Sequence, residues 1–238
     1  MPQANPSSKP AGYLQSVPGI AIALITLSLL MATACSKKRS GKPANRDGGG
    51  SQSQASNTPN PKASSTGKIK FKKPGGATAF SLKLKDDGLK LVDANEKELA
   101  RITHSESDKY KFKDAADKTL GYVTGAAPKF KIKDAAQEKT LFIFQRQEGG
   151  DWKLEDGDEN LICKIGKRDY GWKIEDGAEK ELAKVKTDGG RTSIRDSSDQ
   201  TLFYTNDAIT PLAAVPFGLA QLSQPQQAAL SAALKQVQ

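Results

Sequence analysis

Hydrophobic and polar residues alternate in four similar stretches in the middle of the chain. They read KYKFKD (109–114), KFKIKD (129–134), WKLED (152–156) and WKIED (172–176). A period of two, with aromatic and aliphatic residues at every second position, predicts a strand that buries one face. The residues that follow, such as TLFIF (140–144) and NLICKI (160–165), predict a second strand with less strict alternation. Each unit is therefore interpreted as a β-hairpin.

The unit recurs about every 20 residues. An aspartate ends the first strand of each unit, with spacings of 21, 20, 22, 20 and 20 residues: Asp93, Asp114, Asp134, Asp156, Asp176 and Asp196. A leucine follows five to seven positions later: Leu99, Leu120, Leu141, Leu161, Leu182 and Leu202. The aspartate can bond its own backbone in an Asx-turn, and DG at 156–157 and 176–177 is a turn signal. Six hairpins give twelve antiparallel strands, to which 68–73 and 80–85 can add a further pair.

Twelve short strands in one meander would leave two exposed edges unless the sheet closes. Six hairpins would supply only three propeller blades, fewer than propellers have. We therefore predict a mainly β fold, a closed antiparallel barrel of about twelve strands. A barrel of this size is too wide for the side chains of its own wall to fill, so something must occupy its centre.

The C-terminal tail is the candidate for that role. Residues 208–224, AITPLAAVPFGLAQLSQ, carry no charge and are apolar nearly all round, as expected of a buried helix. A second, Ala-rich segment begins near Pro225, which suits a first-turn proline. We predict that a C-terminal apolar helix threads the barrel and that the Ala-rich helix caps its mouth. A β-solenoid of six coils is the competing architecture, and it leaves the apolar tail unexplained.

The first residues predict where the protein is located in the cell. Residues 19–34, GIAIALITLSLLMATA, are uncharged, too short for a typical spanning helix and suited to the apolar core of a secretory signal. Ala32, Thr33, Ala34 and Cys35 resemble the lipobox of bacterial lipoproteins. That resemblance implies removal of a signal peptide, 1–34, and acyl chains such as palmitate on Cys35. The alternatives are an uncleaved N-terminal anchor and a plain signal with an incidental cysteine. Each places the domain on the extracytoplasmic side of a bacterial membrane, in the cell envelope.

The segment after Cys35 predicts a tether. Residues 36–66 contain no aromatic residue, Leu, Ile or Val, and Gly, Ser, Asn, Pro and Gln dominate. Such a segment cannot bury enough apolar surface to order itself. The expected organisation is a signal peptide (1–34), a lipidated cysteine with a disordered tether (35–66) and a barrel with C-terminal helices (67–238).

The repeated hairpins over 87–205, together with the apolar tail over 208–222, resemble the tubby C-terminal-like fold. Its relatives include tubby proteins, phospholipid scramblases and the plant LURP-one-related proteins. The resemblance implies a barrel around a central helix. Tubby proteins bind phosphoinositides through a basic patch, but no residue-by-residue match to that patch exists here, so no binding site is carried over.

The charge balance favours anionic partners. The chain has 36 Lys and Arg against 27 Asp and Glu, a net charge of +9. This suits anionic lipid head groups, cell-wall polymer or nucleic acid, and the extracytoplasmic address argues against nucleic acid. Period two places a set of lysines on the outside of neighbouring hairpins, where they could hold phosphate: Lys111, Lys113, Lys131, Lys133, Lys153 and Lys173. The alternative is a solvated outer face on which lysines block strand-edge association.

Other candidates for chemistry are weak. His104 has no second histidine for a metal cluster, and Cys163 is expected to be a small buried hydrophobe. The acidic stretch 155–160 misses the spacing of a calcium loop. We therefore expect no catalytic residue, metal or cofactor. The predicted function is that of a monomeric, lipid-anchored protein with a non-catalytic binding or structural domain. By analogy with scramblases, the alternative is a phospholipid-acting protein or enzyme.

Overall fold

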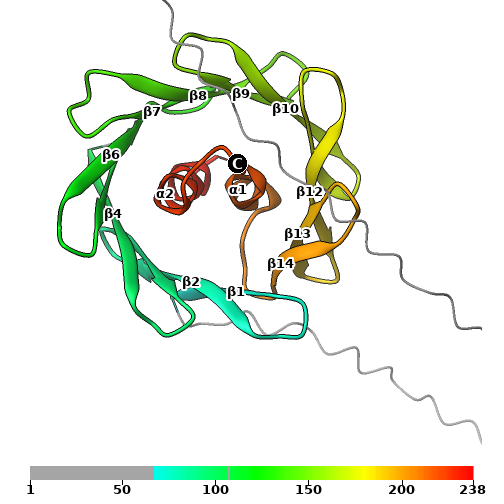
Figure 1. Cartoon of the computed structure of the whole chain (residues 1–238), viewed down its shortest axis with the longest axis horizontal. Helices are drawn as coiled ribbons and strands as arrows, with labels where there is room; N and C mark the ends of the chain where they lie inside the picture. Colours follow the sequence, from blue (N-terminus) through cyan, green and yellow to red (C-terminus); the bar gives the residue numbers. More distant parts are fainter. Residues whose placement is uncertain (1–66, 107, 238) are drawn as a thin grey trace, which may run out of the picture. The chain divides into compact units, whose positions relative to one another are not determined.

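The hairpins join side by side until the sheet closes on itself. The computed structural model describes residues 67–106 and 108–237, in which fourteen antiparallel strands form one closed barrel (Figure 1). The strands are β1 (Lys68–Lys72), β2 (Thr78–Lys85), β3 (Gly88–Asp93), β4 (Glu98–Glu106), β5 (Lys109–Asp114), β6 (Thr119–Thr124), β7 (Lys129–Lys133), β8 (Thr140–Arg146), β9 (Trp152–Asp156), β10 (Leu161–Arg168), β11 (Gly171–Glu175), β12 (Glu181–Asp188), β13 (Arg191–Asp196) and β14 (Thr201–Thr205). Each strand pairs with the next along the chain, and β14 pairs with β1.

The closed barrel is confirmed. It has fourteen strands and not about twelve, because the further pair expected from 68–73 and 80–85 forms β1 and β2 and completes the ring. The β1–β2 hairpin lacks the aspartate that ends the first strand of the other six hairpins, so the regular spacing of aspartates does not reveal it. The seam between β1 and β14 is short, with a single paired position, Lys72 opposite Tyr204. Beyond it the Asp207 carboxylate accepts a hydrogen bond from the Lys70 amide at 2.7 Å, which continues the seam. Because the sheet closes into a barrel, the alternative of a β-solenoid is excluded.

Asx-turns connect the two strands in five of the six repeated hairpins, as predicted, whereas in the turn after β7 the Asp134 side chain accepts the Lys139 amide at 3.1 Å. In the turn after β11, one oxygen of Asp176 accepts the amides of Ala178 and Lys180, at 2.9 and 3.0 Å. The DG dipeptides do not supply the left-handed residue of these turns. That conformation falls three residues after the aspartate, on residues with φ of 60° to 67°: Glu96, Asp117, Gln137, Glu159, Glu179 and Asp199.

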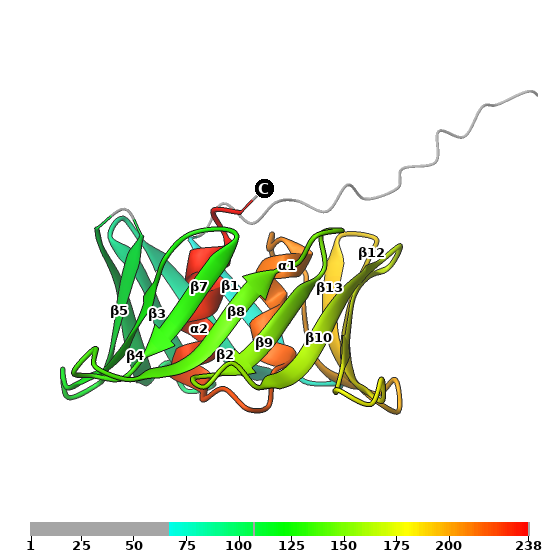
Figure 2. The ribbon, with the colours of Figure 1, turned by 90° about the horizontal axis from the view of Figure 1, so that it is seen from above.

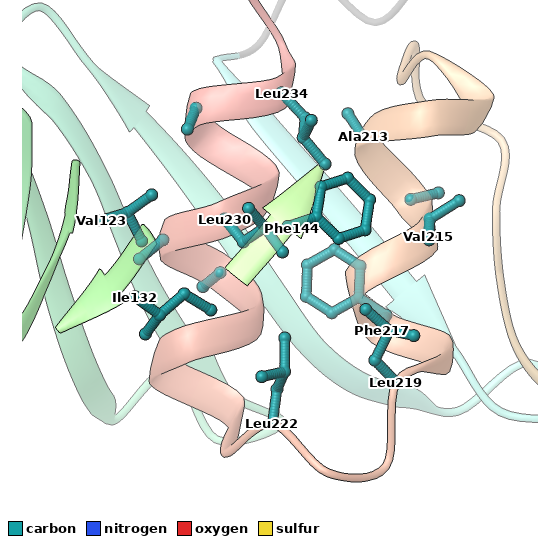
Figure 3. Packing of buried hydrophobic residues seen from close by; sticks show 14 of the residues in the cluster. Val123, Ile132, Phe144, Ala213, Val215, Phe217, Leu219, Leu222, Leu230 and Leu234 are labelled. Carbon is teal, nitrogen blue, oxygen red and sulfur yellow. The ribbon is translucent and has the colours of Figure 1, made fainter. Parts of the chain in front are cut away.

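The chain after β14 turns inward and fills the barrel. It forms α1 (Pro211–Ala214), the 3₁₀ helix η1 (Val215–Gly218) and α2 (Gln224–Leu234). Thr210 Oγ1 caps α1 by accepting the Ala213 amide, and the Gln226 side chain accepts the Ser223 amide before α2. Leu230 and Leu234 of α2 face the same core as Val215 and Phe217 (Figure 3).

The predicted central helix is thus two short helical turns, and the Ala-rich helix does not cap the mouth. It runs back through the interior, and Figure 1 shows both helical segments inside the ring. The reason is that α2 is buried on nearly all sides: Ala228, Ala229, Leu230, Ser231, Ala233 and Leu234 are at most 3% exposed. Small side chains let a second helix fit beside the first within a fourteen-strand barrel.

The two ends of the barrel differ. The Asx-turns and the β1–β2 loop lie at one end, here called the turn end. The opposite end, here called the open end, carries the other loops, the start of β1 and the last residues of α2 (Figure 2). The chain enters the barrel at Gly67 on the open end, where Leu84 donates to the Gly67 carbonyl.

Candidate functional site

The structure does not bring the six predicted lysines into one site. All six lie on strands whose alternate residues are buried, so their outward placement is confirmed. Three of them are held by carboxylates. Lys113 pairs with Asp117 at 2.9 Å, Lys153 with Glu155 at 2.6 Å, and Lys173 with Glu175 at 2.6 Å. Hydrogen bonding to Glu175 raises the pKa of Lys173.

The other three gather with a fourth lysine around β6. Lys111 of β5 and Lys133 of β7 are both directly opposite Tyr122. One position further along the same face, Lys109 and Lys131 are both opposite Thr124. Because neighbouring strands are about 4.8 Å apart, lysines on β5 and β7 start about 10 Å from each other. The four residues Lys109, Lys111, Lys131 and Lys133 are named here the β5–β7 lysine cluster.

Tyr122 is the centre of this cluster. Its ring belongs to the outer face and yet is only 9% exposed. The ammonium groups of Lys109 and Lys111 lie 5.1 and 5.9 Å from the ring centroid, within the range of cation–π attraction. The lysine stems can cover an apolar ring while their charges stay in water. The ring therefore positions two positive charges side by side.

Gly121 allows β6 to take this place. A Cβ at this position would lie 2.4 Å from the Lys133 carbonyl oxygen and 2.6 Å from the Phe112 ring. Both distances are shorter than any real contact of a Cβ. A side chain at 121 would push β7 away or displace Phe112, so glycine keeps Tyr122 between the lysines of its two neighbouring strands.

The charge of this cluster is not neutralised within the described part of the chain. None of its four lysines forms an ion pair with a carboxylate there, whereas Lys133 donates to the Gln137 carbonyl oxygen at 3.3 Å. Glu106 of β4 lies opposite Lys109, and Asp117 pairs with Lys113. The pKa of Asp117 is lowered first by its hydrogen bond with Lys113 and further by the charge of Lys111. Four positive charges over three strands can attract phosphate groups, for which lysine acts as a point charge.

A second row of basic residues differs from the β5–β7 lysine cluster because its charges are paired with carboxylates. Five cations lie opposite one another on consecutive strands: Lys68, Lys83, Lys90, Arg101 and Lys113. Carboxylates at the turn end match this row. Glu96 pairs with Lys68 and Lys83, and Glu98 pairs with Lys90 and Arg101. This row is a salt-bridged part of the outer wall, so it is a poorer anion site than the β5–β7 lysine cluster.

The Glu96 pairing predicts a pH-dependent contribution to stability. Hydrogen bonds from Lys68 and Lys83 lower the pKa of Glu96 to about 2, from 4.5. A lowered folded-state pKa stabilises the fold above about pH 4.5, and that contribution disappears as the pH falls through about 2. Glu96→Gln should therefore reduce the urea midpoint at pH 7, and the difference from the unaltered protein should vanish by about pH 2. Glu148→Gln, in an exposed loop, is the control and should change little at either pH. An equal loss at both pH values would contradict this account.

Two members of the site were missed from the sequence. Lys109 is the first residue of its alternating stretch but was not counted among the outward lysines, and Tyr122 lies in the less regular second strand of its hairpin. Period two correctly faces Lys111, Lys131 and Lys133 outward. It also places Glu155 and Glu175 on the same face as Lys153 and Lys173, but it does not show that Lys113 faces Asp117, the left-handed residue of the turn after β5.

The remaining candidates have structural surroundings. His104 stacks on Tyr110 with ring centroids 4.6 Å apart. Cys163 is fully buried, and burial raises the pKa of its thiol to about 12. Residues 155–160 include the Asx-turn of Asp156, which accepts the Asp158 and Asn160 amides. Within 67–106 and 108–237, no three His, Cys, Asp or Glu side chains come close enough together to hold a metal ion.

The segments on which the predicted localisation depends lie outside the described residues: the signal peptide (1–34), Cys35 and the tether (36–66). In the part of the chain that the structure describes, no helix combines the length and apolar character needed to cross a membrane.

Comparison with protein families and with curated proteins finds no match to this chain. Among solved structures, its barrel fold resembles the X-ray structure of a protein from Arabidopsis thaliana. The two chains share 11% identity over 65% of this chain and 89% of the other, with a TM-score of 0.36. A likeness at this level establishes neither family nor activity, so the tubby-like resemblance stays a prediction.

Proposed function

We propose that this protein is a lipid-anchored component of a bacterial cell envelope whose barrel is a non-catalytic module that binds phosphate-bearing anionic surfaces. The observation that carries the proposal is the β5–β7 lysine cluster, which holds four positive charges around Tyr122 without a carboxylate partner in the described residues. Anionic lipid head groups are the first expected partner. Anionic wall polymer offers the same chemistry.

The net charge of +9 supports this assignment, because it favours approach to any anionic surface. The predicted anchor adds to it. Two acyl chains bind a membrane stably where one does not, and the anchor would hold the barrel at the surface that its lysines contact. A tether of 31 residues would let the barrel reach on the order of 30 Å from its anchor and present its side to the surface.

The anchor is tested by replacing the lipobox cysteine. In cells fed a clickable palmitate analogue, Cys35→Ala should abolish labelling of the protein and block removal of residues 1–34. Cys163→Ala is the matched control. It should leave labelling unchanged, because the Cys163 thiol is buried and its pKa is raised to about 12. Labelling that persists in Cys35→Ala would contradict the lipoprotein assignment.

The binding surface is tested with two variants of equal charge. In the barrel, residues 67–238, the first replaces the cluster lysines Lys109, Lys111, Lys131 and Lys133 by Gln. The second replaces four lysines that already face carboxylates: Lys113, Lys153, Lys173 and Lys184. Each basic residue near an anionic surface contributes ~1 kcal/mol. The first variant should therefore lose at least tenfold in binding to phosphatidylglycerol vesicles, and the second much less.

The unaltered barrel should bind more weakly to neutral phosphatidylcholine vesicles, because these carry no net negative charge. High salt should also weaken binding to anionic vesicles, because it screens exposed charges. An equal loss in both variants would mean that net charge alone matters, and it would contradict the assignment to this cluster. A loss seen with wall polymer and not with vesicles would assign the cluster to the polymer instead.

A further inference from the structure

An apolar cavity opens beside α2 at the open end of the barrel. Its volume is about 540 Å³, within the range of roughly 300–1,000 Å³ found for small-molecule sites. Its apolar wall includes Ile69, Leu82, Leu84, Leu89, Ile209 and Ala232. Of these, Leu84, Ile209 and Ala232 pack against the core but stay partly exposed.

The arrangement of the helices leaves this space. Within the barrel α2 packs against β3 to β6, whereas α1 and η1 pack against β11 to β13. In front of β1 and β2, the turn end is filled by Phe71 and Phe80 against Phe217, with centroid distances of 4.7 and 5.2 Å. At the open end, small side chains of the two helices, Ala213 and Ala232, face the next inward residues of these strands. The aromatic rings therefore fill the turn end, and the cavity at the open end is lined by aliphatic and polar residues.

Several polar groups around the cavity already have hydrogen-bond partners within the protein. The Asp207 carboxylate accepts the Lys70 amide, and Thr210 Oγ1 accepts the Ala213 amide. Thr187 and Thr192 face each other at 3.4 Å. Lys235, at the end of α2, is exposed and forms no ion pair with the described residues. The result is an apolar chamber whose charged lining residues are Lys235 and Asp207, and the Asp207 carboxylate is already hydrogen-bonded to the Lys70 amide.

We propose that this cavity binds a single-chain anionic amphiphile, a long-chain fatty acid, with its acyl chain inside and its carboxylate beside Lys235. The apolar wall favours a hydrocarbon chain, because burying each CH₂ group raises affinity. A ligand of this shape leaves no polar group buried without a partner, since its single charge stays at the mouth. The site is separate from the β5–β7 lysine cluster, which lies on the outer face of the barrel, and the proposal does not depend on that cluster.

The test uses the full chain in lipid nanodiscs and a photoreactive palmitic acid with its diazirine near the end of the acyl chain. After irradiation, peptide mass spectrometry should find the label in peptides that contain Leu82–Leu89 or Ile209–Ala213. Competition by unlabelled fatty acids should strengthen up to about fourfold per added methylene until the cavity is full. Palmitate should compete better than hexadecanol, and Lys235→Gln should reduce that preference about two- to fivefold.

Ala232→Phe fills the cavity and should reduce labelling of those peptides at least tenfold. Ala126→Phe is the matched control. It lines a smaller cavity of about 320 Å³ on the other side of α2 at the same end, and it should leave labelling unchanged. Since Ala232→Phe could disturb folding, Leu84→Gln is a second variant. It places a polar group at a half-buried wall position and should weaken labelling with the circular dichroism spectrum unchanged.

Three outcomes would overturn the proposal. The first is label found only in residues 19–34, and the second is equal labelling of Ala232→Phe and Ala126→Phe. The third is labelling that appears only with Cys35→Ala, which would mean that the chain's own acyl group fills the cavity. The lysine-cluster variant should label normally, so failure here is distinguishable from failure of vesicle binding.

Discussion

Removing the chain from Thr210 onward is expected to unfold the barrel and not to trim it. The deletion takes away α1, η1, α2 and the loop between η1 and α2. Together they supply eleven apolar residues that are at most 5% exposed: Ala213, Ala214, Val215, Phe217, Leu219, Leu222, Ala228, Ala229, Leu230, Ala233 and Leu234. Losing one fully buried Leu or Phe side chain costs ~2–5 kcal/mol, and the stability of a whole domain is ~5–15 kcal/mol. The loss of several such residues exceeds that total.

The strand side chains could not recover the lost packing. They point inward from a ring of fourteen strands that is too wide for wall side chains to fill, so the deletion would leave them facing water. The measurement is urea denaturation of residues 67–238 followed by the fluorescence of Trp152 and Trp172, which are 2% and 8% exposed. We expect the truncated barrel to show no cooperative transition.

The control is a shorter deletion that removes only 236–238. It leaves α2 complete and should keep a cooperative transition close to that of the unaltered barrel. A truncation at Thr210 that retained the same midpoint and slope would mean that the sheet stands without its contents. That outcome would contradict the role assigned here to both helical segments.

The barrel could be predicted from sequence because its two causes are local. Strict alternation in stretches such as 109–114 shows a strand with one buried face, and the recurring aspartate shows where each strand turns. The apolar character of 208–222 shows that it is buried. The strand number could not be obtained this way, because ring closure depends on a seam of a single paired position, Lys72 with Tyr204.

The path of α2 was also hidden. An Ala-rich helix has no strongly apolar face, so its composition does not separate a helix on the surface from one packed among large side chains. Here Val123 and Ile132 of the wall lie on one side of α2, and they belong to the same buried cluster as Phe144 and Leu230 (Figure 3). The sequence predicted only part of the candidate site. Alternation sets which lysines face outward and places Glu155 and Glu175 beside Lys153 and Lys173, but the pairing of Lys113 depends on Asp117, which comes from a turn.

Phe217→Ala is expected to be the most destabilising single truncation in the tail. Phe217 is 5% exposed, and its ring lies 4.7 Å from that of Phe71 and 5.2 Å from that of Phe80. Phe80 in turn meets Phe203 of β14 edge-on at 5.4 Å. Phe217 therefore holds together β1, β2 and β14, where the ring closes. Truncating a buried Phe to Ala costs ~3–5 kcal/mol, and aromatic pairs add ~0.5–1.5 kcal/mol.

The measurement is the urea midpoint of the barrel, with the slope of the transition as a check on two-state unfolding. Leu202→Ala is the control, since Leu202 is 40% exposed on β14 and should shift stability by only about 0.5 kcal/mol. Phe217→Leu keeps most of the volume and should recover most of the loss. Because the Phe217 ring supports the seam, amide exchange at Lys70 and Lys72 should also quicken in Phe217→Ala. A loss no larger than that of Leu202→Ala, with unchanged exchange, would show that the tail does not hold the barrel closed.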